Sequence, residues 1–192
     1  GGGNNMTGDL AEMIVVSDAL HYGQRAPYED YLSAKWFGQA TERTPSAFGQ
    51  TIIWVDANQP GTINTAGDAV TSWANLGVDG GAFANGGFPD ARPTVVSDGL
   101  AGKPVIRFDG GDALVQNGID LRESGPEGAY TIVAVIVPPT SGATELVFQG
   151  LDTDNDNPGL ALSVSPNVPS VDFLHRWPSA AAGGKTIMPT AD

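Results

Sequence analysis

The sequence contains no cysteine, and only nine of its 192 residues are lysine or arginine, against 22 that are aspartate or glutamate. The lack of cysteine excludes a disulfide framework and any metal site built from thiolates. The formal net charge of −13 repels polyanions, which argues against nucleic-acid binding. The sequence also lacks an apolar run of about 18 residues, so we expect no membrane insertion.

Catalytic patterns are scarce as well. The two histidines, His21 and His175, do not lie beside a motif that would supply a serine nucleophile. His175 alternates with Phe173 and Trp177, which favours a place in the core or at a sheet edge. Retaining glycosidases need two carboxylates about 5 Å apart, and no predicted strand carries a Glu-x-Asp-x-Glu pattern. We therefore expect no catalytic residues and no enzyme.

What the sequence does contain is a series of short β-type runs separated by glycine, asparagine, aspartate and proline. This pattern predicts an all-β fold, an antiparallel β-sandwich of the jelly-roll type. The run at residues 130–137 is apolar on both faces and is expected to be a central strand covered on both sides. Residues 108–112 (FDGGD) are expected to form a turn. The other runs lie at residues 9–16, 51–57, 93–96, 102–107, 145–149, 159–165 and 171–177.

One short helix near the N-terminus, at residues 27–37, completes the prediction. Glu29 and Asp30 are expected near the positive end of its dipole, and Gly38 is expected to end it. Its apolar stripe, expected to pack on a sheet, is formed by Tyr28, Tyr31, Leu32 and Trp36.

Two groups of segments resemble one known family. The segments IIWVDA, SWANLG, ARPTVV and GKPVIRFDGGDALV, between residues 52 and 115, resemble the start of a laminin-G-like, concanavalin A-like jelly-roll domain of bacterial secreted and surface proteins. The segments GDLAEMIVVSDAL and YEDYLSAKWFG, between residues 8 and 38, are similar to the C-terminal end of such a domain, a last strand followed by a short helix. The chain departs from the family at Pro27, which lies inside the expected helix, and at His21, where serine or threonine is usual.

The resemblance places the end of a family domain before the beginning of one. We therefore expect residues 1–38 to be the C-terminal strand and helix of a previous repeat or a donated element, residues 39–50 to be a linker, and residues 51–192 to be a jelly roll that is incomplete at its C-terminal end. Two interpretations remain. In the first, the chain is a segment of a tandem array and holds the end of one repeat and the body of the next. In the second, the first strand and helix complete a jelly roll, either in their own chain or in a neighbour.

Candidate ligand residues cluster in one acidic loop. Asp152, Asp154 and Asp156 alternate along it and could together supply the hard oxygen ligands that calcium prefers. The EF-hand pattern is not met, and the alternative is a hairpin whose side chains bond to their own backbone. For a sugar ligand, the candidates are Asn155 and Asn157 of this loop together with Trp177.

The resemblance implies a non-catalytic extracellular module for binding or adhesion within a larger multidomain bacterial surface protein. Its partners would be carbohydrate or cell-surface protein, and its signal peptide would lie outside this chain. The alternative is a structural subunit of an extracellular filament, sheath or surface layer. Such a subunit would assemble by exchange of residues 9–37 between neighbouring copies.

Overall fold

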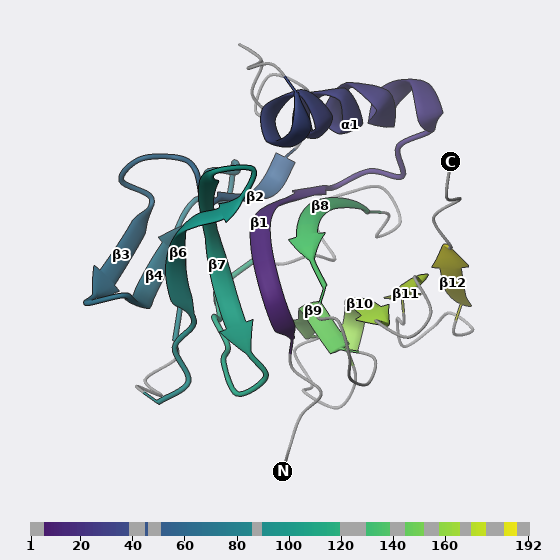
Figure 1. Ribbon diagram of the computed structural model, residues 1–192. Coiled ribbons are helices and arrows are strands. Elements are labelled where there is room, and N and C mark those ends of the chain that lie inside the picture. The colour runs from purple at the N-terminus through teal and green to yellow at the C-terminus, as the bar shows by residue number, and fades with distance from the viewer. Residues whose placement is uncertain are drawn as a thin grey trace. The chain divides into compact units, whose positions relative to one another are not determined.

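The structure is a computed structural model that describes residues 6–38, 45, 51–85, 90–119, 130–138, 145–151, 158–165, 170–175 and 183–187 (Figure 1). Within these ranges the chain forms one helix, α1 (Tyr22–Phe37), and twelve strands. The strands are β1 (Thr7–Val16), β2 (Thr51–Asp56), β3 (Ile63–Ala66), β4 (Ala69–Ala74), β5 (Ala82–Ala84), β6 (Thr94–Leu100), β7 (Lys103–Asp109), β8 (Thr131–Val137), β9 (Glu145–Leu151), β10 (Pro158–Ser165), β11 (Ser170–His175) and β12 (Gly183–Ile187). The predicted all-β, antiparallel sandwich class with a single helix near the N-terminus is confirmed.

The chain divides into two compact units. One comprises Asp9–Phe108 and Ala113–Val137 and holds α1 with nearly all of an eight-stranded sheet. The other comprises Gly1–Gly8, Asp109–Asp112 and Pro138–Asp192 and holds a four-stranded sheet in the order β12-β11-β10-β9.

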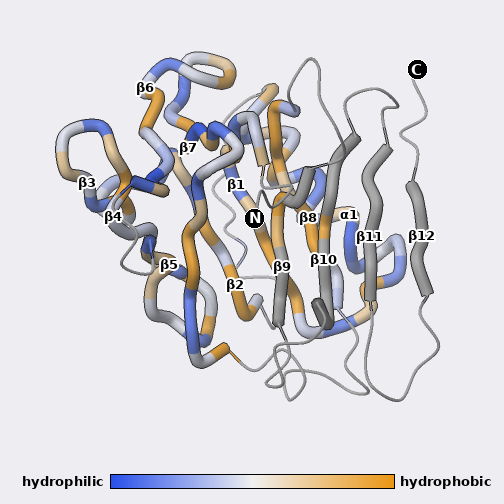
Figure 2. Tube along the Cα trace, turned by 90° about the horizontal axis from the view of Figure 1, so that it is seen from below, coloured by the Kyte–Doolittle hydropathy of each residue, from blue (hydrophilic) through white to orange (hydrophobic). Residues whose placement is uncertain are grey.

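Strand β1 is the most enclosed strand of the eight-stranded sheet. The main path of this sheet runs β2-β1-β7-β6-β4-β3, while β8 pairs with β1 and β5 pairs with β4. Since β2 and β8 both pair with residues 12–16 of β1, they occupy its two opposite edges. The β-branched run Ile14-Val15-Val16 suits this position, and all three side chains are buried. Figure 2 shows hydrophobic stretches along β2 and hydrophilic loops between the strands.

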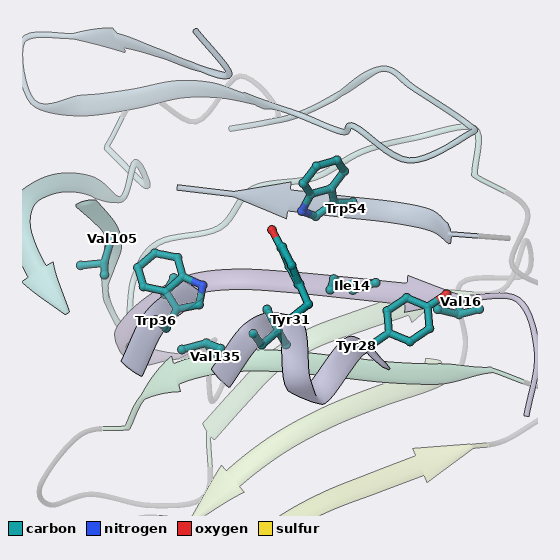
Figure 3. Packing of buried hydrophobic residues seen from close by; sticks show 10 residues of the cluster. Ile14, Val16, Tyr28, Tyr31, Trp36, Trp54, Val105 and Val135 are labelled. Atoms are coloured by element: carbon teal, nitrogen blue, oxygen red, sulfur yellow. The ribbon is translucent and has the colours of Figure 1, made fainter. Parts of the chain in front are cut away.

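Helix α1 packs on this sheet through the predicted apolar stripe, which is confirmed. Tyr28, Tyr31, Leu32 and Trp36 are its buried residues. They contact residues of β1, β2, β7 and β8, including Ile14, Trp54, Val105 and Val135 (Figure 3). A helix whose apolar side chains recur every three to four residues buries one face in this way.

The start of α1 differs from the prediction. The helix begins at Tyr22, where His21 is the N-cap residue and donates its backbone N–H to the Gln24 side chain at 3.2 Å. Pro27 therefore lies inside the helix, and the expected place of Glu29 and Asp30 in the first turn is wrong. At the other end, Gly38 is the C-cap residue as predicted, and its N–H bonds to the Ala34 carbonyl at 3.2 Å.

Other features of the strands differ from what the sequence suggested. In β8 only Val135 is buried and Val137 is exposed, so this strand is not covered on both sides. Trp73 of the SWANLG segment lies in β4 and is buried, and the turn begins at Asn75. Strands β3, β4, β5 and β12 were not predicted. The sequence of β12, GGKTI, opens with two glycines and contains only two β-forming residues. The FDGGD turn is confirmed by the bond from the Asp109 N–H to the Asp112 carboxylate at 2.9 Å.

The segment after β4 is held against β2 by one asparagine. The Asn75 side-chain oxygen accepts the Trp54 and Gly77 N–H groups, each at 2.9 Å, and its amide donates to the Ile52 carbonyl at 3.1 Å. Gly77 consequently lies so close to β2 that a Cβ atom there would be 2.3 Å from the Ile52 carbonyl oxygen. The SWANLG segment thus has a structural role.

We expect Gly77→Ala to lower the free energy of unfolding by at least about 2 kcal/mol, because the added methyl group overlaps backbone atoms that cannot move aside. Gly23→Ala is the matched control. Gly23 lies in α1, and its nearest neighbour to an added Cβ is a His21 ring atom at 3.4 Å. That change should raise stability by about 0.5–1 kcal/mol. Urea unfolding of both variants measures the two effects, and a tolerated Gly77→Ala would contradict the described packing.

Candidate functional site

A fully buried carboxylate lies between α1 and the sheet. Glu12, in the middle of β1, has 0% of its surface exposed. Its Oε1 atom accepts hydrogen bonds from the Tyr31 hydroxyl and the Trp54 indole N–H, each at 2.8 Å. Its Oε2 atom accepts from the Lys35 ammonium and the Trp36 indole N–H, each also at 2.8 Å. Figure 3 shows the Tyr31 hydroxyl and the Trp54 indole nitrogen directed toward one another from helix and strand.

Lys35 connects this carboxylate to a second one. Its ammonium group also forms an ion pair with Asp56, which lies opposite Glu12 in the β1–β2 register. Asp56 in turn organises the β2–β3 turn: its carboxylate accepts the Asn58 N–H at 2.9 Å, and its backbone carbonyl accepts the Thr62 hydroxyl at 3.2 Å. We refer to Glu12, Tyr31, Lys35, Trp36, Trp54 and Asp56 as the Glu12 cluster.

The electrostatics of the cluster follow from its burial. Desolvation raises the pKa of Glu12, the neighbouring Asp56 raises it further, and Lys35 lowers it. The pKa of Tyr31 is raised by burial and by the adjacent carboxylates, so this phenol stays protonated as a donor. Since all four hydrogen bonds to Glu12 come from protein groups and none of its surface is exposed, a substrate cannot reach this carboxylate. The cluster joins α1, β1 and β2.

A depression open to solvent lies beside the turn that Asp56 organises. It has a volume of about 520 Å³. The β2–β3 turn, strand β3, the β3–β4 turn, β6 and β7 all contribute to its lining. Five polar residues line it, namely Asn58, Gln59, Thr65, Asp68 and Ser97.

The polar side chains of the depression are available to a ligand. Within the described part of the chain, the side chains of these five residues have no hydrogen-bond partner. Gln59, Thr65, Asp68 and Ser97 are also exposed. The depression is therefore the candidate binding site of this unit.

Sequence reasoning missed this site. Its residues come from turns and strand faces that are distant in the chain, and the only local signal was the turn-forming sequence of residues 58–61 (NQPG) and of residues 67–68 (GD).

The sequence-predicted ligand residues lie elsewhere. Asp152, Asp154, Asp156, Asn155, Asn157 and Trp177 all fall outside the described residues. The flanking strands β9 and β10 pair antiparallel, with Leu151 opposite Pro158. Among the residues that the structure describes, no group of three or more histidine, aspartate or glutamate side chains could hold a metal ion. The calcium and sugar sites in this loop stay predictions.

Comparisons of the chain with models of protein families, with curated proteins and with solved structures give no match. In the part of the chain that the structure describes, no helix has both the length and the apolar character needed to cross a membrane.

Loss of Lys35 should be costly, because it leaves two buried carboxylates without their cation. We expect Lys35→Met to lower the free energy of unfolding by about 3–5 kcal/mol at neutral pH. Arg25→Met is the matched control on the same helix. It removes the Arg25–Glu29 pair, whose side chains are 42% and 43% exposed, and should cost no more than about 1 kcal/mol. Equal effects of the two changes in urea unfolding would contradict the assigned role of Lys35.

The Lys35→Met defect should also depend on pH. Lys35 lowers the pKa of Glu12, so its removal raises that pKa further above the unfolded value. The folded variant then binds more protons than its unfolded chain. Its stability should therefore be greatest below the ordinary glutamate pKa of about 4.5 and fall as pH rises through the raised folded pKa. Urea unfolding of wild type and variant between pH 4 and 8 measures this, and a difference that stays constant with pH would refute the linkage.

Proposed function

We propose that the chain is a non-catalytic binding or adhesion module of the laminin-G-like, concanavalin A-like class, acting extracellularly within a larger bacterial surface protein. The supporting observation is the composition of the Glu12 cluster. Glu12 comes from the segment GDLAEMIVV, Lys35 and Trp36 from YLSAKWFG, and Trp54 and Asp56 from IIWVDA. The residues that carry the family resemblance are thus the residues that meet in one buried network.

A binding role also suits the chemistry of the described unit. Its most buried carboxylate is enclosed by protein donors, while the candidate site is an open depression whose polar side chains have no partner among the described residues. Such a surface can hold a polar ligand, but it offers no paired acid and base for catalysis. Carbohydrate or a surface protein is the proposed partner, with calcium as a proposed ion of the 152–157 loop.

The alternative role, a filament or sheath subunit, would use the same contacts between copies. β1 and α1 dock on β2, β7 and β8, and these are the contacts that exchange would have to reproduce. Exchange would transfer these contacts to a neighbour without changing them.

One experiment separates the two roles. The full chain is passed over a sizing column with light scattering at concentrations from about 1 μM to 1 mM, and it is applied to an array of immobilised neutral and acidic glycans, with calcium and with EDTA. We expect a monomer at all concentrations and saturable binding to neutral glycans. Polymer formation without glycan binding would contradict the binding module and favour the assembly subunit. Loss of glycan binding in EDTA would support the proposed calcium site, and unchanged binding would contradict it.

A further inference from the structure

The depression of about 520 Å³ lies on the sheet face that points away from α1. Val95 and Ser97 of β6 line it, whereas Val96 between them packs against the α1 core. In β7, Pro104 lines it and the next residue, Val105, packs against α1. Because successive side chains of a strand point to opposite faces, the depression and the helix are on opposite sides of β6 and β7. A ligand can therefore bind there without disturbing the α1 contacts.

We propose that this depression binds a neutral saccharide, an inference that rests on the proposed binding function and names its site. The polar side chains that line it have no partner among the residues that the structure describes, so they offer donors and acceptors for sugar hydroxyls; they belong to Asn58, Gln59, Thr65, Asp68 and Ser97. The apolar surface of Pro60, Ile63, Val95 and Pro104 lies among them and suits the C–H face of a sugar ring.

Charge and size select the ligand further. The Asp68 carboxylate accepts hydrogen bonds from hydroxyl groups and repels anionic groups, as does the net charge of −13. Neutral sugars are therefore favoured over uronic or sialic acids. The volume lies within the range of about 300–1,000 Å³ that is usual for small-ligand sites.

Three of the polar residues, Asn58, Gln59 and Asp68, stand on turns that are fixed before any ligand arrives. Asp68 belongs to a two-residue turn between β3 and β4 in which Gly67 adopts a φ of 64°, and the Asp68 carbonyl accepts the Val95 N–H at 3.0 Å. The Gln59 carbonyl accepts the Thr62 hydroxyl at 2.8 Å. Because these turns are already ordered, ligand binding carries a smaller entropic cost for immobilising loops.

The test uses the full chain labelled with ¹⁵N and titrated with lactose, maltose and N,N′-diacetylchitobiose, together with any neutral glycan that the array identifies. We expect amide shifts at residues 57–68 and 95–97. We also expect Asp68→Ala to weaken binding by about tenfold or more, because it removes charge-assisted hydrogen bonds. Asp98→Ala is the matched control, since Asp98 is an exposed β6 residue that does not line the depression and its removal changes the net charge equally.

The outcomes distinguish the site from the function. Sugar binding with amide shifts at other residues, or equal weakening of binding by Asp68→Ala and Asp98→Ala, would overturn the proposed site. Either result would still be consistent with a binding module. Absence of binding to every sugar on the array and in the titration would overturn both. Shifts at the depression with selective loss in Asp68→Ala establish both.

Discussion

The burial of the Glu12 carboxylate is the constraint on which the described unit depends. Removing a charged group from water costs several kcal/mol unless it is paired and hydrogen-bonded. Here the pairing requires donors from two elements, with Tyr31, Lys35 and Trp36 on α1 and Trp54 on β2. Only one register of β1 against β2 and one rotation of α1 bring these donors to the same carboxylate. The cluster therefore specifies the arrangement of three elements in addition to stabilising it.

The same network extends to the surface. Lys35 joins Glu12 to Asp56, and Asp56 fixes the β2–β3 turn through the Asn58 N–H and the Thr62 hydroxyl. That turn lines the depression, so the position of its polar side chains is set from the core outward. A surface site supported in this way keeps its geometry although its own residues are exposed. The residues that shape the site, in the Glu12 cluster, are therefore different from the residues that would contact a ligand.

The sequence predicted what depends on local pattern. The buried stripe of α1 followed from helical spacing, and the end of α1 followed from Gly38, because both signals lie within one element. The start of α1 was missed because its N-cap residue is His21, a type that is unusual there, although Gln24 at the third helical position is usual in a capping box. The Glu12 cluster and the depression could not be predicted, since they join residues that only the tertiary structure brings together, such as Thr65 and Ser97.

Chain connectivity bears on the choice between a binding module and an assembly subunit. α1 ends at Phe37 and β2 begins at Thr51, so a short connection links the donor segment to the sheet that receives it. Short connections give effective concentrations of about millimolar order, which a neighbouring chain must exceed to compete. Because exchange would only reproduce the contacts of Glu12 and the α1 stripe, it gains no new interaction to offset this advantage. Docking within one chain is therefore favoured at ordinary protein concentrations, and this preference favours the module over the subunit.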